Sequence, residues 1–267
     1  MTRLKEQDLA VSAGAELLRF DIELERKIGA SLQDISTSSN GLSLSDFENK
    51  AMGTVIAAVP VTSGLGVITG FADAVAGIIS YLGFSIFVTE ATDVAGIHEA
   101  GTKGVDWIFL ADDDRFLGID RMRNRMTEND KATAKGYIQI LETATGGLSG
   151  KEVLILGCGR VGKEALKLLE AKGAFPVLYD KNSQKTKFFT KYKILGSPEE
   201  IKEYPLVFDA TDESGWLTDE MLHPDVWIAA PGLPISLTDE TLELRKDRIV
   251  HDRLPIGVAV MLGELCR

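Results

Sequence analysis

The chain has 267 residues, 45% hydrophobic and 26% charged, which is enough apolar material for one large or two ordinary folded domains. Its formal net charge of −11 opposes binding to a nucleic-acid backbone, and its apolar runs are too interrupted to predict a membrane span. The two cysteines and three histidines lack metal-ligand spacing, so we expect no metal site.

Apolar residues recur at helical spacing between positions 5 and 35, which predicts an amphipathic opening helix. The polar start of the chain shows no signal peptide, so we expect a cytoplasmic protein without nucleic-acid or membrane partners. Residues 36–41 predict a loop, and Ser45 with Glu48 predicts the capped start of a short helix. The oligomeric state stays open.

Alternating strands and helices predict a small parallel α/β sheet between residues 55 and 111. The expected strands are 55–61, 84–89 and 107–111, and the expected helices are 71–82 and 93–102. Functional groups in such sheets gather beyond the carboxyl ends of the strands. Here these ends hold Thr62-Ser63-Gly64, Glu90 and Asp112-Asp113-Asp114.

A long helix over 127–145 precedes three glycines, Gly146, Gly147 and Gly150, which mark a domain boundary. A second α/β pattern follows, with a helix at 161–172 and strands at 152–156, 175–179, 206–209, 226–229 and 248–250. The predicted fold class is therefore α/β. We expect a helical lid and small α/β substrate domain over 1–147, then a Rossmann NAD-binding domain over 148–267.

The strongest motif is a glycine fingerprint between the strand at 152–156 and the helix after it. Gly157, Gly159 and Gly162 satisfy G-x-G-x-x-G, and the motif includes Arg160 and Val161. Such a motif binds a dinucleotide diphosphate at the helix N-terminus. The alternative is a tight turn in a cofactor-free domain.

The next strand ends in Asp180, where an acid binds the ribose hydroxyls and repels the additional phosphate of NADP. The fingerprint therefore predicts NAD as the cofactor, although Lys181 and Lys185 weaken this preference.

Two later strand ends are suited to the remainder of a dinucleotide site. Ala210-Thr211 follows the strand at 206–209, where the nicotinamide-side ribose is expected, and Pro231-Gly232 follows the strand at 226–229. The backbone of the second turn would border the nicotinamide ring. Each segment is also compatible with an ordinary strand-end turn.

Three motifs of the first domain, at 59–68, 93–100 and 111–117, are more specific than the glycine fingerprint. Together with Asn129 and the segments 152–162, 210–211, 231–234 and 254–257, they resemble the pyrrolysine synthase family in the same order along the chain. This resemblance covers nearly the whole sequence.

The resemblance implies NAD-dependent oxidation of the terminal amine of 3-methyl-D-ornithyl-N6-L-lysine, a small dipeptide-like substrate. Ammonia release and pyrroline ring closure would then give L-pyrrolysine. It also implies that Ser63, Asp112 and Asn129 line the substrate pocket, with Asp112 holding an ammonium group or helping to remove its proton. Asp252 stands where the family has a glutamate, and the opening helix, with Leu4, is expected to cover the substrate as a lid.

Other functions remain open from the residues alone. A different NAD-dependent dehydrogenase for amino or hydroxy acids would need a cationic clamp, for which the strand ends of the first domain offer little beyond Arg115. A non-catalytic NAD-binding regulator would need no substrate pocket. Asp112 and Ser63 also suit plain helix-capping roles.

Overall fold

The computed structural model describes Leu9 and residues 14–66 and 68–267, and the chain divides into two compact units. Unit 1 is drawn from Met1–Glu25, Ala30–Gly136 and Arg253–Arg267. Unit 2 is drawn from Arg26–Gly29 and Tyr137–Asp252. Among the described residues, no helix is long and apolar enough to cross a membrane.

The helical opening consists of α2 (Gly14–Ile28), α3 (Leu32–Asn40) and α4 (Leu44–Met52) instead of one long helix and a loop. The break falls at Gly29, whose φ of 72° is left-handed, and Ser31 then caps α3 by accepting the Asp34 N–H. The predicted loop at 36–41 is wrong, because α3 continues to Asn40.

The cap of α4 also differs from the prediction. It is Ser43, which accepts the Asp46 N–H, and not Ser45.

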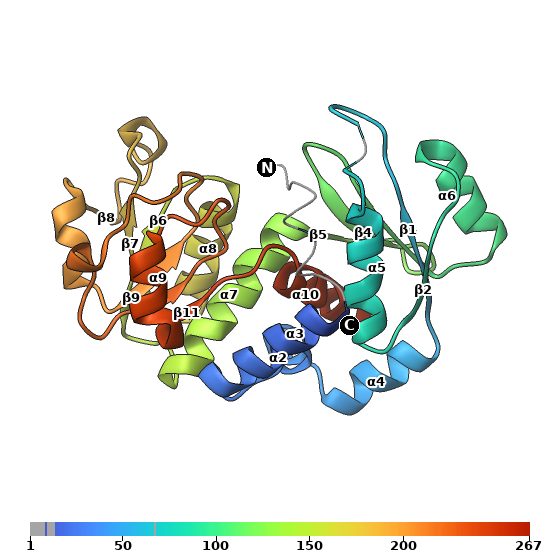
Figure 1. The fold of residues 1–267 in the computed structure, drawn as a ribbon, viewed down its shortest axis with the longest axis horizontal. Coiled ribbons are helices and arrows are strands. Elements are labelled where there is room, and N and C mark those ends of the chain that lie inside the picture. The colour runs from blue at the N-terminus through green and yellow to red at the C-terminus, as the bar shows by residue number, and fades with distance from the viewer. Residues whose placement is uncertain (1–8, 10–13, 67) are drawn as a thin grey trace. The chain divides into compact units, whose positions relative to one another are not determined.

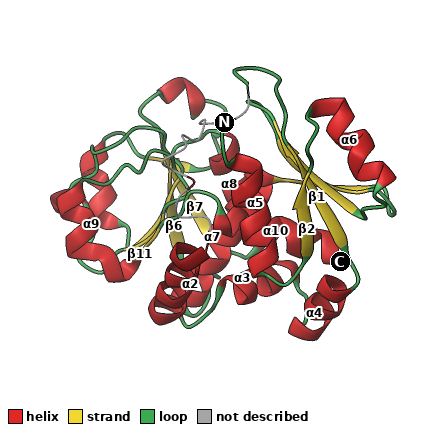
Figure 2. Ribbon diagram, turned by 45° about the vertical axis from the view of Figure 1, so that its right-hand side comes forward, coloured by secondary structure: helices red, strands yellow, loops and turns green. Residues whose placement is uncertain are grey.

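The sheet of unit 1 has the order β2-β1-β3-β4-β5. Three parallel strands, β1 (Val55–Val59), β2 (Ser85–Val88) and β3 (Trp107–Ala111), match the prediction. Helices α5 (Phe71–Tyr81) and α6 (Asp93–Thr102) lie on opposite faces of these strands (Figures 1 and 2). The antiparallel strands β4 (Phe116–Asp120) and β5 (Arg125–Glu128) extend the sheet and were not predicted.

The last helix, α10 (Pro255–Cys266), belongs to unit 1 and packs against α3 (Figure 1). Ten of its twelve residues are buried, and a helix that is apolar on all sides needs neighbours all round. The sequence boundary at 147/148 placed this segment in the Rossmann domain, whereas the compact division places Arg253–Arg267 with the first unit. The other boundary falls inside α7 (Asn129–Thr145), between Gly136 and Tyr137.

The sheet of unit 2 is parallel, with the order β11-β10-β9-β6-β7-β8. This is the doubly wound order of a Rossmann domain, in which β6 and β9 flank the point where the winding reverses. Its members are β6 (Glu152–Leu156), α8 (Arg160–Ala171), β7 (Phe175–Tyr179), β8 (Lys193–Ile194), β9 (Leu206–Asp209), β10 (Trp227–Ala229), α9 (Asp239–Arg245) and β11 (Ile249–Val250). Short 3₁₀ turns lie at Ser183–Lys185, Pro198–Glu203, Asp219–Met221 and Lys246–Arg248.

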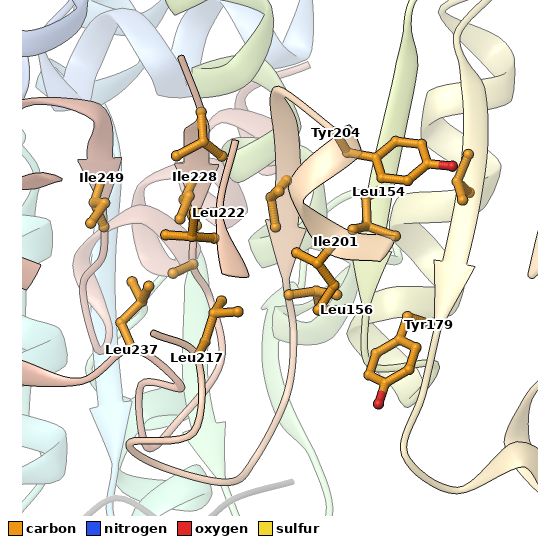
Figure 3. Packing of buried hydrophobic residues seen from close by; sticks show 14 of the residues in the cluster. Leu154, Leu156, Tyr179, Ile201, Tyr204, Leu217, Leu222, Ile228, Leu237 and Ile249 are labelled. Carbon is orange, nitrogen blue, oxygen red and sulfur yellow. The ribbon is translucent and has the colours of Figure 1, made fainter. Parts of the chain in front are cut away.

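One face of this sheet is covered by an apolar cluster (Figure 3). Leu154 and Leu156 of β6 and Ile228 of β10 supply its strand side, and Ile201 and Leu217 come from the connecting segments. All five side chains are at most 1% exposed, so burial of their apolar surface fixes the strands and therefore the turns at their ends. The α/β class with a Rossmann-type domain is thus confirmed.

Candidate active site

The glycine loop joins β6 to α8, and two of its glycines are required by the protein itself. Gly157 has a φ of 87°, and a Cβ there would lie 2.7 Å from the Ala210 carbonyl oxygen. A Cβ on Gly162 would collide with the carbonyl oxygen of Gly157. These two positions therefore fix the tight turn and the close packing of α8 on the sheet.

Gly159 is different, because neither its backbone nor its packing requires glycine. Its φ is −72°, and within the described part of the chain no atom lies within 4 Å of an added Cβ. It caps the N-terminus of α8, where unpaired N–H groups and the helix dipole favour an anion. The missing side chain leaves room for a diphosphate to approach the backbone, so the loop fits a dinucleotide.

Asp180 follows β7 and lies directly beside this loop. Its Oδ2 accepts the Cys158 N–H at 2.8 Å, and its Oδ1 accepts the Asn182 N–H at 2.9 Å. Lys185 Nζ is 3.8 Å from Oδ2, whereas Lys181 pairs with Glu213 at 2.9 Å. The acid therefore stands at the corner where an adenosine ribose is expected.

The thiol of Cys158 is buried in the glycine loop, and this burial raises its pKa to about 12. The group is therefore protonated at neutral pH and is a poor nucleophile. Among the residues that the structure describes, no group of three or more His, Cys, Asp or Glu is placed to hold a metal ion.

The two later turns of unit 2 are joined to each other by Asp209, the last residue of β9. Thr211 donates its N–H and hydroxyl to Asp209 Oδ1 at 3.1 and 2.7 Å, and Gly232 donates its N–H to the Asp209 carbonyl at 2.9 Å. The predicted turns at Ala210-Thr211 and Pro231-Gly232 are thus both hydrogen-bonded to Asp209. Sequence reasoning missed Asp209, although an acid closing an apolar strand was a visible signal.

In unit 1, Ser63 lies exposed in the loop after β1, and two acids anchor that loop. Thr62 donates its N–H and hydroxyl to Asp93 at 2.7 and 2.5 Å. Leu65 donates its N–H to Asp113 Oδ2 at 2.6 Å. The bond from Leu65 places the loop of Ser63 next to the turn after β3, and the pKa of Asp93 is lowered by its bonds from Thr62.

Asp112 is the first residue of that turn, and its Oδ1 accepts the N–H groups of Asp114 and Arg115 at 2.8 and 2.7 Å. These backbone bonds lower its pKa, so the exposed carboxylate is ionised and weakly basic at neutral pH. Such a group is better suited to hold an ammonium than to take a proton from it.

Arg115 lies on the same turn and is engaged by two carboxylates. It bonds Glu128, the last residue of β5, and its Nε is 3.4 Å from Asp114 Oδ2. This pairing joins the turn of Asp112 to the start of α7, where Asn129 lies. Unit 1 therefore brings together the segments that carry Ser63, Asp112 and Asn129.

Asn129 has a buried Oδ1 without a hydrogen-bond partner among the described residues. A Cβ on Gly257 of α10 would collide with this oxygen and would lie 2.7 Å from Thr133 Oγ1. Gly257 thus lets α10 approach Asn129 closely. Sequence reasoning did not assign it a role, although it closes the quoted segment 254–257.

Asp252 lies in unit 2 and is buried. Its N–H donates to the Tyr137 hydroxyl at 2.7 Å, and burial raises the pKa of that phenol. Leu4 lies outside the described residues.

Solved structures of dehydrogenases share this fold. Shikimate dehydrogenase from Aquifex aeolicus matches with 14% identity and a TM-score of 0.51, over 81% of this chain and 91% of that one. Quinate dehydrogenase from Corynebacterium glutamicum, in complex with NAD, matches with 12% identity and a TM-score of 0.53, over 80% of this chain and 93% of that one.

The sheet order and the glycine loop define a Rossmann-type fold, and together with the relatives that follow they make this chain an oxidoreductase. The family described as "Pyrrolysine biosynthesis protein PylD, N-terminal domain" matches residues 15–127. Pyrrolysine synthase from Methanosarcina barkeri is 27% identical over 95% of this chain and 97% of the relative. Pyrrolysine synthase from Methanosarcina acetivorans is 31% identical over 78% of this chain and 80% of the relative. The chain belongs to the pyrrolysine synthase family, which confirms the resemblance predicted from the motifs.

Proposed function

We propose that this enzyme oxidises the terminal amine of 3-methyl-D-ornithyl-N6-L-lysine with NAD and forms L-pyrrolysine. The carbon that bears the amine gives up a hydride, its nitrogen loses a proton, and an imine results. Water adds to the imine and ammonia leaves, which gives a semialdehyde. The ornithine α-amine then condenses with the aldehyde and a water leaves, which closes the pyrroline ring.

The observation that carries this proposal is the free space beside Gly159 at the N-terminus of α8, in a chain that aligns with pyrrolysine synthases over most of its length. The diphosphate of NAD would lie against Gly159, Arg160 and Val161 at the N-terminus of α8. Asp180 would bind the adenosine ribose, and the turns at Ala210-Thr211 and Pro231-Gly232 would border the nicotinamide half. When bound, NAD supplies the hydride acceptor.

A preference for NAD over NADP follows from the charges at the same corner. The Asp180 carboxylate would repel a 2′-phosphate. Lys181 is engaged by Glu213 and also lies 4.5 Å from the centre of the Trp216 ring, so its charge is already compensated. Lys185 remains nearer, at 3.8 Å from Asp180, and reduces the preference without reversing it.

The substrate side of the proposal rests on unit 1, with Asp112 as the residue that holds an ammonium group. Its low pKa keeps it ionised, and Ser63 and Asn129 would supply hydrogen bonds from the neighbouring segments. A carboxylate substrate would instead need a cationic clamp, but Arg115 already pairs with Glu128 and Asp114. Asp252 and Leu4 stay predicted substrate-binding residues, and the opening helix stays a predicted lid.

The direct test mixes purified protein with the dipeptide and either NAD or NADP, and follows dinucleotide reduction and product mass together. We expect NADH and a product of pyrrolysine mass. Dinucleotide that binds but is never reduced, with this dipeptide and with its unmethylated analogue, would contradict the proposed reaction. The search would then turn to other amino or hydroxy acids, and the dinucleotide site would stand.

A matched pair of variants tests the role of Asp112. Asp112→Asn removes the charge but keeps an oxygen that accepts the N–H groups of Asp114 and Arg115, so the turn is retained. Asp114→Asn, two residues away and also exposed, is the control. We expect KM for the dipeptide to rise at least about tenfold in the first variant only. Equal KM values in both would refute the ammonium-binding role.

A further inference from the structure

A fully buried carboxylate lies at the end of β9, and the functions assigned above leave it unexplained. Asp209 has no exposed surface. Its Oδ1 accepts the N–H and hydroxyl of Thr211, and its Oδ2 accepts the hydroxyl of Ser236. Burial raises its pKa, while these donors and the nearby His251 oppose the rise. Burying a carboxylate costs free energy, which the hydrogen bonds from its partners must offset. The identity of these partners therefore indicates the role of Asp209.

These bonds connect two chain segments that are separate in sequence. Thr211 lies in the turn after β9, and Ser236 lies beyond the turn after β10. The Gly232 N–H also donates to the Asp209 carbonyl at 2.9 Å. A Cβ on Gly232 would collide with the Thr211 carbonyl oxygen, so the two turns are already in close backbone contact. Asp209 therefore fixes the first turn relative to the second from both its backbone and its side chain.

The sheet order indicates which half of a dinucleotide these turns would meet. A Rossmann domain binds one mononucleotide on each side of its switch point. The β6-β7-β8 side holds Asp180, the acid expected at the adenosine ribose. The β9-β10-β11 side, which holds Asp209 and both of the turns that it joins, is left for the nicotinamide mononucleotide.

We propose that Asp209 is the positioning residue of the nicotinamide half of the cofactor site. By holding Thr211, Gly232 and Ser236 in one arrangement, it fixes the two turns that would border the nicotinamide ring and its ribose. It does not touch the reacting atoms, because it is wholly enclosed by protein. This inference rests on the dinucleotide site of the proposed function.

The test compares two ligands that differ at the nicotinamide end. NADH contains both halves, whereas ADP lacks the nicotinamide base and the ribose that bears it, and titration calorimetry measures the affinity for each. We expect Asp209→Ala to weaken NADH binding at least about tenfold, the scale of a lost hydrogen-bonded carboxylate, and to leave ADP affinity within about twofold. Asp209→Asn keeps an oxygen acceptor for Thr211, so it restores most of the NADH affinity.

Ser236→Ala is the second variant, and it keeps the proposal testable if Asp209→Ala does not fold. It removes one hydroxyl donor, and we expect a smaller loss of NADH affinity, about threefold, again with ADP affinity unchanged. Equal losses for both ligands would show a purely structural role and overturn the assignment, as would NADH affinities that none of the variants changes. A wild-type protein that binds neither ligand would overturn the cofactor site itself, and this inference with it.

Discussion

Replacing Gly159 by alanine tests whether this glycine is needed for ligand binding or for folding. A glycine needed only for binding can be replaced with loss of affinity but little loss of stability. At a φ of −72° alanine is unstrained, and no described atom lies within 4 Å of the new Cβ. Alanine is a poorer N-cap than glycine by about 0.5–1 kcal/mol, but the lower entropy of the unfolded chain returns about 0.4–1 kcal/mol. The free energy of unfolding should therefore stay within about 0.5 kcal/mol of wild type.

The same methyl group would occupy the space into which the diphosphate is expected to fit. We expect NAD affinity to fall at least about tenfold, or about 1.4 kcal/mol. Gly162→Ala is the matched contrast, because its Cβ collides with Gly157 and should cost about 1–3 kcal/mol of stability. Urea unfolding of the ligand-free protein and calorimetric titration with NAD measure the two quantities. A Gly159→Ala protein that binds NAD like wild type would refute the reasoning.

Three further changes have defined outcomes. Asp180→Asn should lower the ratio of NADP to NAD dissociation constants at least about tenfold, as measured by calorimetry, and an unchanged ratio would contradict its role. Because the pKa of Asp112 is lowered, the group stays ionised down to below its ordinary value of about 4. Titration of Asp112 should therefore cause no fall of kcat/KM above that pH. Any acid limb that wild type shows above that pH should persist in Asp112→Asn. Glu264→Ala removes the carboxylate paired with the largely buried Lys135 and should cost about 1–3 kcal/mol in urea unfolding, whereas Glu243→Ala, in an exposed pair, should cost little.

The sequence predicts those elements of the fold whose signal is local. Residues 55–59, 107–111 and 153–156 are continuous apolar runs, and a buried parallel strand requires that pattern. The antiparallel strands β4 and β5 are short, and the turn between them is rich in arginine and contains Asn124 at a φ of 51°. The pairing of β4 with β3 and of β5 with β4 depends on register, which hydrophobic periodicity does not reveal.

The candidate site shows the same division. Gly157, Gly159, Gly162 and Asp180 were predictable as a candidate dinucleotide site, because one turn and one ribose would dictate their spacing. Asp93 and Asp209 were not, because each works through a partner that is distant in sequence, Thr62 in the first case and Ser236 in the second. An acid that closes an apolar strand is visible in the sequence, but no spacing rule gives the remote segment that it anchors, so its role is recognised only once the fold is known.

The return of α10 to unit 1 has a consequence for how the protein is made. Ribosomes complete residues 137–252 before residues 253–267, so the dinucleotide unit can fold while unit 1 still lacks the helix that packs against α3. During that interval the apolar surfaces that α10 will cover are open to water and to other nascent chains. Biosynthesis that stops after residue 252 would therefore yield an intact unit 2 attached to an unfinished unit 1 with exposed apolar surface.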